Sequence, residues 1–171
     1  MTTRRRRSPV VGSIVCLSKD GKVLLHRRAQ GPLAGYVGLP GGKVEFGESA
    51  LQAGLRELEE ETGLVAEDAR VAGVYTVVNV VEDQPDGHYI LFVVSAHSYS
   101  GALIQRTIEG ENFWAAQSSV SEVQQALPDL FYVLEMVEKH PVFIGHMLRY
   151  NVGGRLKVVT ADGKEYDSTR S

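Results

Sequence analysis

The segment at residues 41–64, GGKVEFGESALQAGLRELEEETGL, restricts the fold of this chain more than any other. Ser49 followed by Gln52 is a capping-box pattern, which predicts the start of a helix. Gly63 is placed to end that helix as a C-terminal cap. We therefore expect a helix over about 50–62 that directly follows a glycine-rich loop.

The two faces of this helix differ in character. Leucines at i, i+4 and i+7 predict a buried apolar stripe made of Leu51, Leu55 and Leu58. Glu57, Glu60 and Glu61 share another face, where like charges repel unless a cation lies between them. Carboxylate oxygens at this spacing suit Mg²⁺ or Mn²⁺ rather than zinc. A solvated acidic face is the alternative, and the glycine-rich loop in front of the helix favours the metal site.

β-Hairpins are predicted on both sides of the helix. Residues 9–28 are two apolar runs joined across Asp20–Gly21, a strong hairpin signal. Residues 71–98 are two runs rich in β-branched and aromatic residues, and QPDG at 84–87 predicts the turn between them. ENFWAA at 111–116 predicts one more short strand.

The C-terminal third predicts a further helical region and a last hairpin. Ser119 and Glu122 have the spacing of a second capping box, and Pro128 suits the first turn of a helix that runs to about His140. Residues 153–167 predict a terminal hairpin. The order of strands, helix, strands and helix favours an α/β fold with a mixed sheet sandwiched between helices over a doubly wound parallel sheet.

Composition indicates one domain and excludes some partners. With 171 residues, 43% of them hydrophobic, we expect a single domain at 9–171 after a flexible basic tail at 1–8. The 18 basic residues include four arginines at 4–7, so 14 remain against 21 acidic residues. An acidic body argues against a stable nucleic-acid complex. Cys16 is the single cysteine and no apolar run could cross a bilayer, so we expect a reduced cytoplasmic setting without membrane association.

The spacing of residues from Gly42 to Leu64 resembles the signature of a known family. It matches the Nudix hydrolase box at every defined position: Gly42, Glu48, Arg56-Glu57-Leu58, Glu60-Glu61 and Gly63-Leu64. The resemblance implies the Nudix fold from about residue 10 to residue 140. The stretch 141–171 lies outside it and is expected to be an extension that contains the terminal β-hairpin.

The resemblance also implies roles for individual residues. The expected ligands of divalent cations are the Gly41 carbonyl, Glu57, Glu60 and Glu61. Glu48 is expected at or beside the metal ions, and Arg56 is expected to orient the glutamates through salt bridges. Bound Mg²⁺, or Mn²⁺, would neutralise phosphate oxygens and make a water molecule nucleophilic.

The proton acceptor varies within the family, between the helix and a loop that follows the second run of strands. Glu109 and Glu111 are the loop candidates in this chain, and the sequence does not separate them. Arg27 and Arg28 end a strand ahead of the glycine-rich loop, where an arginine could bind phosphate. Alternation along a strand lets only one of the two face the site.

Three further residues are candidates for contact with the substrate. His88 and Tyr89 could stack on a base or hydrogen-bond to it, although such residues more often simply end a strand. Asn79 lies among β-branched residues, so it either faces a pocket or marks a bulge. The neighbouring aromatic pair Phe113 and Trp114 is expected in the core.

The marks of several Nudix branches are absent. The proline of ADP-ribose hydrolases is missing about fifteen residues after the box, where Val78, Asn79 and Val80 stand, and Pro85 is too far along. The remaining pattern is similar to MutT-like nucleoside triphosphate pyrophosphatases. It implies Mg²⁺-dependent cleavage of a nucleoside triphosphate to a monophosphate and pyrophosphate. The alternatives are an ADP-ribose or nucleoside diphosphate-sugar hydrolase and a non-catalytic nucleotide sensor. A homodimer through the terminal hairpin is also expected.

Overall fold

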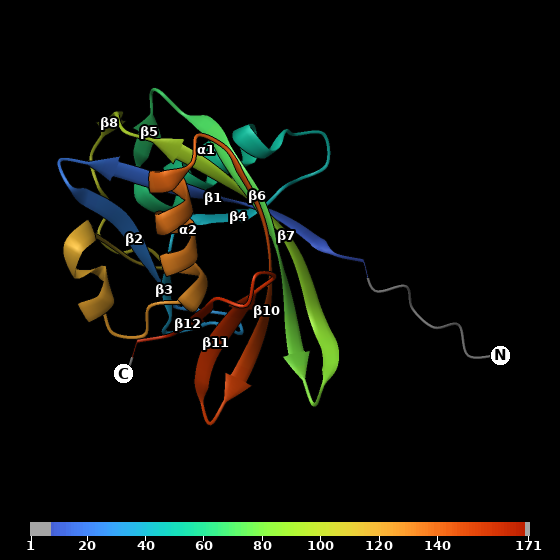
Figure 1. Ribbon diagram of the computed structural model, residues 1–171. Helices are drawn as coiled ribbons and strands as arrows, with labels where there is room; N and C mark the ends of the chain where they lie inside the picture. Colours follow the sequence, from blue (N-terminus) through green and yellow to red (C-terminus); the bar gives the residue numbers. More distant parts are fainter. Residues whose placement is uncertain (1–7, 170–171) are drawn as a thin grey trace.

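A computed structural model describes residues 8–169 of the chain, and the basic residues 4–7 of the expected tail lie outside this range (Figure 1). The helices are α1 (Ala50–Thr62), the 3₁₀ helix η1 (Gln117–Glu122) and α2 (Pro128–Lys139). The strands are β1 (Val10–Lys19), β2 (Lys22–Arg28), β3 (Val37–Gly38), β4 (Gly41–Lys43), β5 (Leu64–Ala66), β6 (Arg70–Val81), β7 (Gln84–Ala96), β8 (Tyr99–Gly101), β9 (Gly110–Ala116), β10 (Phe143–Val152), β11 (Arg155–Thr160) and β12 (Glu165–Asp167).

The main sheet has the strand order β12-β11-β10-β6-β7-β1-β2-β3, with β4 paired to β1 and β9 paired to β2. Parallel pairs join β1 to β7 and β6 to β10, and the other neighbours are antiparallel. Strands β5 and β8 form a separate two-stranded sheet. The sheet is therefore mixed, as the sequence predicts.

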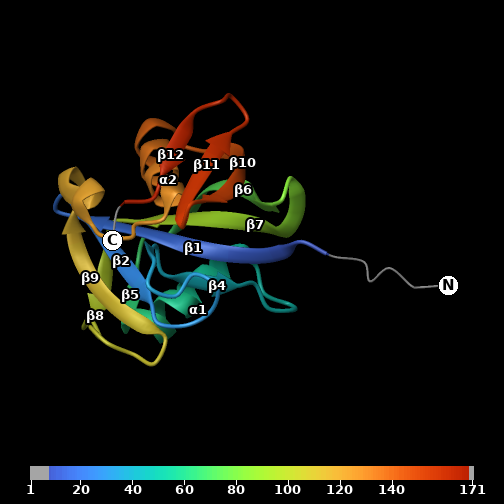
Figure 2. The ribbon, with the colours of Figure 1, turned by 90° about the horizontal axis from the view of Figure 1, so that it is seen from below.

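Helices α1 and α2 cover opposite faces of this sheet (Figure 2). Alternation along β1 explains the two faces, because successive side chains of a strand point to opposite sides. Val15 and Leu17 pack in one core cluster with Leu58 of α1. Cys16 packs in the other cluster with Val133 of α2. One helix on each side gives the layered α/β arrangement expected for the Nudix fold.

Local sequence signals place several elements correctly. The β1–β2 turn has Asp20 and Gly21 at φ 50° and 71°, so both residues take the left-handed conformation of a tight hairpin. Helix α1 begins with the Ser49–Gln52 capping box and ends at Gly63, whose φ is 72°. Pro128 occupies the first turn of α2. The predictions of these three features are confirmed.

Three local predictions are wrong. The β6–β7 turn lies at Glu82 and Asp83, with φ 48° and 58°, and the expected turn residues 84–87 belong to β7. Residues 117–122 form a 3₁₀ helix whose N-cap has no side-chain hydrogen bond, so Ser119 and Glu122 make no capping box there. On α1 the predicted buried stripe is confirmed at Leu58 only, because Leu51 and Leu55 are half-buried; the other buried positions are Ala53, Gly54, Glu61 and Thr62.

Strand β10 was not predicted, and it connects the C-terminal strands to the main sheet. It pairs in parallel with β6, with Met147 opposite Val77, and it carries the β11–β12 strands on its other side. The chain between β6 and β10 contains β7, β8, β9, η1 and α2, and α2 leads directly into β10. The predicted terminal hairpin is present as β11 and β12, and together with β10 it forms a three-stranded continuation of the main sheet (Figure 1). Within residues 8–169, no helix is long and apolar enough to cross a membrane.

Candidate active site

The glycine pair at 41–42 brings the backbone of the loop against both the sheet and helix α1. Gly41 lies opposite Ile14 of β1 with φ 146°, and a Cβ there would stand 2.2 Å from the Ser13 carbonyl oxygen. A Cβ on Gly42 would stand 2.3 Å from Glu57 Oε1. Any side chain at these positions would displace the loop or the Glu57 carboxylate. The glycines are therefore required for close contact between the loop and α1.

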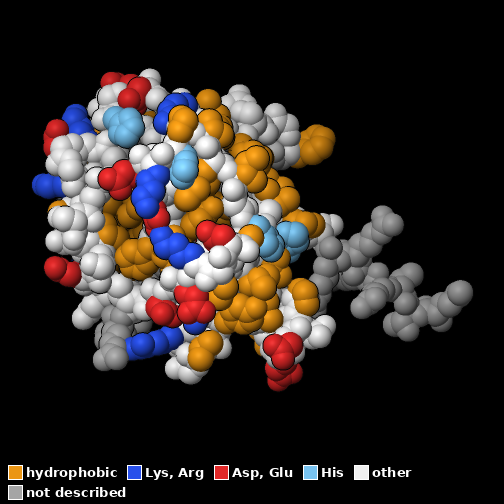
Figure 3. All heavy atoms as spheres, viewed as in Figure 1, with side chains coloured by type: hydrophobic (Ala, Val, Ile, Leu, Met, Phe, Trp, Pro, Cys, Tyr) orange, Lys and Arg blue, Asp and Glu red, His pale blue; other side chains and the backbone are white. Residues whose placement is uncertain are grey.

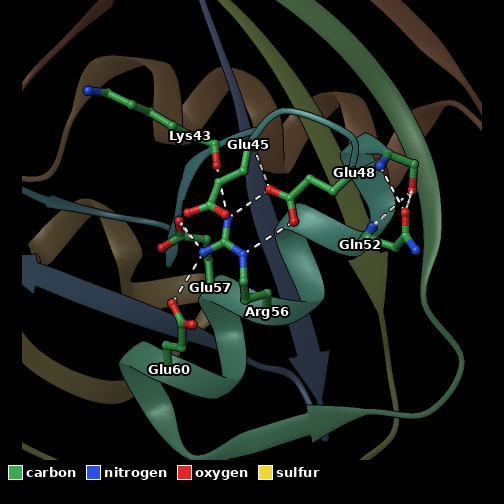
Figure 4. A network of polar contacts seen from close by, with 8 residues as sticks. Lys43, Glu45, Glu48, Gln52, Arg56, Glu57 and Glu60 are labelled. Atoms are coloured by element: carbon green, nitrogen blue, oxygen red, sulfur yellow. Dashed lines mark hydrogen bonds and ion pairs between the residues drawn. The ribbon is translucent and has the colours of Figure 1, made fainter.

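Arg56 links three carboxylates and the loop backbone (Figure 4). Its Nη2 and Nε donate to the two Glu48 oxygens at 2.8 and 3.3 Å. Its Nη1 donates to Glu57 Oε1 at 2.9 Å and to Glu60 Oε2 at 3.2 Å. Nη2 also donates to the Lys43 carbonyl at 3.1 Å. One planar guanidinium thus orients the loop and the acidic face of α1 together.

The charges in this group do not cancel. Hydrogen bonds from Arg56 hold the pKa of Glu48 below its ordinary value, and the Glu48 and Glu57 carboxylates raise the pKa of Arg56 further. Arg56 therefore stays positive and Glu48 stays negative. A single guanidinium among three carboxylates leaves the group net negative, which favours a bound cation.

Glu61 lies apart from the other glutamates, on the buried side of α1. Its side chain is 6% exposed, and its Oε2 accepts a hydrogen bond from the Gly41 N–H at 2.8 Å. Burial raises the pKa of Glu61 to about 7, and the negative charges of Glu57 and Glu109 add to this effect. The Gly41 N–H and the charge of Arg28 act in the opposite direction. Glu61 thus holds the glycine pair in place, and the charges of Glu57, Glu109 and Arg28 all affect its pKa.

A buried pair behind Glu61 was missed by sequence reasoning. Asn112 of β9 donates to the Glu61 carbonyl at 2.7 Å and to the Ile104 carbonyl at 2.8 Å. Its Oδ1 lies 2.7 Å from His26 Nδ1, and His26 Nε2 lies 3.8 Å from Glu61 Oε1. Both amide hydrogens of Asn112 are used, so its oxygen accepts and His26 Nδ1 carries the proton. The signal that the sequence offered for this pair was the presence of two polar residues, His26 and Asn112, at inward-facing positions of neighbouring strands.

The carboxylates beside the glycine pair suit a hard divalent cation, although their oxygens do not converge on a common point where an ion could bind. No group of three or more His, Cys, Asp or Glu side chains in residues 8–169 is arranged to hold a metal ion. Glu57 and Glu60 converge on Arg56 instead, so a cation would share or replace that contact. The donor set is oxygen-only and net negative, and Glu60 is 60% exposed and free to rotate toward an ion. This chemistry suits Mg²⁺ or Mn²⁺.

The strand register separates the candidates that the sequence left paired. Glu111 lies opposite Arg27, and Asn112 lies opposite His26, so Glu111 and Arg27 point away from the face that holds Glu61. Arg27 Nη1 donates to the Gly35 carbonyl at 2.9 Å, and Glu111 lies 3.5 Å from Arg106. Arg28 lines the cavity beside the glycine pair. Of the pair Glu109 and Glu111, Glu109 is therefore the one on the side of Glu61. Of the pair Arg27 and Arg28, it is Arg28.

A cavity of about 450 Å³ begins at the glycine pair and extends across β1, β6 and β7 toward α2 and β10. Tyr89 and Asn79 line it, whereas His88 is exposed and is not part of its wall. Asn79 also marks a shift of register between β6 and β7, so both alternatives for this residue are present. Phe113 and Trp114 pack in the two core clusters and do not line the cavity. Figure 3 shows this side of the molecule with apolar side chains gathered over the sheet.

Comparison with known proteins supports the same interpretation. Residues 6–138 match the family model described as NUDIX domain. The chain is 32% identical over 123 residues to the uncharacterized Nudix hydrolase YvcI of Bacillus subtilis, covering 72% of this chain and 75% of that protein. It is 38% identical over 95 residues to an ADP-ribose pyrophosphatase of Methanocaldococcus jannaschii, covering 56% and 54%. The crystal structure of the MutT protein from Bacillus halodurans superposes with a TM-score of 0.72 at 24% identity, covering 91% and 94%.

Proposed function

Since the chain belongs to the Nudix family and is a hydrolase of nucleotide phosphoanhydride bonds, we propose that it cleaves a nucleoside triphosphate to a monophosphate and pyrophosphate with Mg²⁺. One observation carries the proposal: the Arg56-linked carboxylates meet the Gly41–Gly42 backbone at one end of a cavity large enough for a nucleoside. Phosphates at that end and a base deeper in the cavity would fill it.

Individual residues have distinct tasks in this proposal. Glu57, Glu60, Glu61 and the Gly41 carbonyl would hold the cation, whose charge neutralises phosphate oxygens and activates water. Arg56 keeps Glu48 and Glu57 in place, and Asn112 fixes the backbone of Glu61. Arg28, on the cavity wall, offers a guanidinium to a phosphate oxygen.

Glu109 is the proposed proton acceptor. Water attacks the α- or β-phosphorus, a new P–O bond forms, and the bond to the leaving phosphate group breaks. The water proton passes to the Glu109 carboxylate, which lies near enough to Glu61 to raise its pKa. Glu111 lies on the opposite side of β9 and is not assigned this step.

Hydrolysis of ADP-ribose or of a nucleoside diphosphate sugar is the second candidate. The relative from Methanocaldococcus jannaschii, named ADP-ribose pyrophosphatase, supports it. A purely binding sensor is a weaker candidate, because every glutamate of the box is retained and held in the network of Arg56 and Gly41.

Product analysis tests these alternatives. The protein is incubated with Mg²⁺ and, separately, with nucleoside triphosphates, ADP-ribose and sugar nucleotides, and the products are resolved by chromatography. Pyrophosphate and a monophosphate from the first panel are expected. Turnover confined to ADP-ribose or sugar nucleotides would replace the proposed substrate, and binding without any turnover would support the sensor.

Two expectations about the setting of the protein remain proposals. Strand β12 ends the main sheet, so we propose that its free edge pairs two copies as a homodimer, which light scattering at micromolar concentration tests. A monomeric mass would contradict it. We also propose a cytoplasmic setting, in which the single cysteine stays reduced; Cys16 is buried, and burial raises the pKa of its thiol to about 11, so the thiol is unreactive.

A further inference from the structure

The main sheet has one side that helices cover only in part. Helix α2 packs against β6 and β10 on the side of the cavity, in a core cluster that includes Val77, Val133 and Met147. On the other side, α1 packs in a cluster with residues of β1, β2 and β7. No residue of β6 or β10, both of which lie within the described residues 8–169, belongs to that second cluster. This side of β6 and β10 therefore has no helix against it (Figure 2).

The uncovered side, which we call the outer face, presents rows of side chains from four strands. It is formed by the even-numbered residues of 74–80 in β6, 88–92 in β7 and 144–152 in β10, and by the odd-numbered residues of 155–159 in β11. The strand register aligns these side chains, so that Ile144 lies beside Val74, and Val74 lies beside Phe92. Ile144 is 83% exposed.

The outer face is large and almost free of charge. Among its positions, all of which the structure describes, only Arg155 and Lys157 at the β11 border are Lys, Arg, Asp or Glu. Strands are about 4.8 Å apart and outward side chains repeat about every 6.8 Å, so its roughly fifteen positions cover about 500 Å². Exposed apolar patches of this size mark contacts with another molecule. Two such faces together would bury about 1,000 Å², which is the size expected of a specific interface.

Opposite charges lie at one end of the outer face. Because β6 and β10 are parallel, the β6–β7 turn and the β10–β11 turn project from the same end of the sheet (Figure 1). Glu82 and Asp83 form the first turn, and Arg155 directly follows the second. All three side chains are exposed. The outer face thus has an acidic corner at β6–β7 and a basic corner at β10–β11.

We propose that the outer face binds the outer face of a second copy of this chain. Two sheets pack face to face about 10 Å apart with their strands nearly aligned, and apolar side chains interdigitate between them. When the two-fold axis runs parallel to the strands, between β6 and β10, the strand order of one copy is reversed over the other. The basic corner of each copy then lies over the acidic corner of its partner. The chain itself therefore supplies the flat, apolar and oppositely charged surface that the outer face requires.

This contact leaves both candidate active sites open. Along β6, Tyr75 and Asn79 line the cavity on the α2 side, whereas Val74 and Val78 point to the outer face. The two cavities of the dimer would therefore face away from one another. The outer face is also distinct from the free edge of β12, and the inference does not depend on which bond the protein hydrolyses.

A charge placed on the outer face tests the proposal. The mass of the full chain is measured by light scattering at micromolar concentration, and the dissociation constant of the dimer is measured by sedimentation equilibrium. Ile144→Lys should raise this constant about tenfold or more, because the two-fold axis buries the added charge twice without a partner. The matched control is Ile108→Lys, since Ile108 is also 83% exposed but lies in the loop before β9. It should leave the dissociation constant unchanged.

Exchange of the corner charges tests how the two copies are arranged. Arg155→Glu and Glu82→Arg each place like charges over one another, at two symmetric contacts, and should each raise the dissociation constant about threefold or more at low salt. The double variant restores opposite charges across the interface. It should therefore bind more tightly than either single variant.

Three results would contradict the proposal. A monomeric wild-type chain would overturn it. A dimer whose dissociation constant is unchanged by Ile144→Lys would also overturn it and would place the contact elsewhere, such as the β12 edge. A double variant as weak as both single variants would refute the proposed two-fold arrangement. Circular dichroism checks that the variants fold, and if Ile144→Lys does not, Val152→Lys decides, at an outer-face position that is 61% exposed.

Discussion

Arg56 holds the candidate active site together. Its removal should lower the free energy of unfolding, and a divalent cation should restore part of that loss. The perturbation is Arg56→Met, which keeps length and helix propensity but removes the charge and every donor. Five hydrogen bonds to three carboxylates and one carbonyl are lost. Glu48 and Glu57 then face one another uncompensated, because their side chains are only 17% and 16% exposed.

The magnitude follows from the exposure of the partners. A hydrogen bond to a charged group contributes roughly 1.5–3 kcal/mol when buried, and an exposed ion pair contributes about 0–1 kcal/mol. The guanidinium is 26% exposed and Glu60 is 60% exposed, so the five contacts cannot each count fully. We expect the free energy of unfolding to fall by about 3 kcal/mol in EDTA, which corresponds to a melting temperature lower by roughly 6–12 °C for a chain of this size.

Metal should reduce that loss. A divalent cation on Glu57 and Glu60 supplies the positive charge that the variant lacks, and binding to the folded state stabilises it by mass action. Thermal unfolding of wild type and variant is therefore measured in EDTA and in millimolar Mg²⁺, with Arg106→Met as the control. Arg106 is 82% exposed and has one 3.5 Å contact to Glu111, so its loss should cost less than about 0.5 kcal/mol.

An equal loss of stability with and without Mg²⁺ would refute this reasoning, because it would mean that the variant binds the cation no more tightly than the wild type does. A loss no larger than that of Arg106→Met would refute the energetic role of the network itself. Because Arg56 orients Glu48 and Glu57, its loss should also lower turnover by about 10–100-fold.

Three other predictions concern Glu57, Asn112 and Glu61. Glu57→Gln should lower turnover by several orders of magnitude with the fold intact, while exposed Glu59→Gln should matter little; equal effects would mean that the acidic face is assigned incorrectly. Asn112→Ala leaves two buried carbonyls and His26 without their partner, so unfolding by denaturant should show a loss of about 3 kcal/mol, and an unchanged midpoint would contradict this. The pKa of Glu61 is raised from 4.5 to about 7, so its folded state binds the proton more tightly and stability in EDTA should fall between these pH values by about 3 kcal/mol. Glu61→Gln should flatten that pH dependence, and an unchanged slope would exclude Glu61 as its source.

The sequence predicts α1 well because its signals are local. The capping box, the C-terminal glycine and the box spacing lie within one segment and need no distant partner. The same local view fails for Glu61, since spacing on a helix shows which residues share a face but not where the edge of the sheet falls. Glu57 and Glu60 face Arg56, while Glu61 turns under the Gly41 backbone.

Strand β10 was missed for a physical reason. Its partner β6 is about seventy positions away along the chain, the pairing is parallel, and β7, β8, β9, η1 and α2 lie between the two strands. Its inward positions include Gly145 and Arg149, which break the apolar alternation expected of a buried strand. Gly145 is needed because a Cβ there would stand 2.0 Å from the Tyr132 hydroxyl. These constraints come from α2 and the cavity and cannot be deduced from the strand itself.

The two ends of the cavity therefore depend on different parts of the chain. The end at the glycine pair is built mainly by the continuous segment 41–64, so a local sequence pattern specifies it. The far end is built by Tyr75 and Asn79 of β6, Asp129 of α2 and Arg149 of β10, which meet only in the folded chain. A match to the box identifies the family, because it specifies the residues around the glycine pair. No local pattern specifies these four distant side chains, and Arg149 is the one that lies outside the family match.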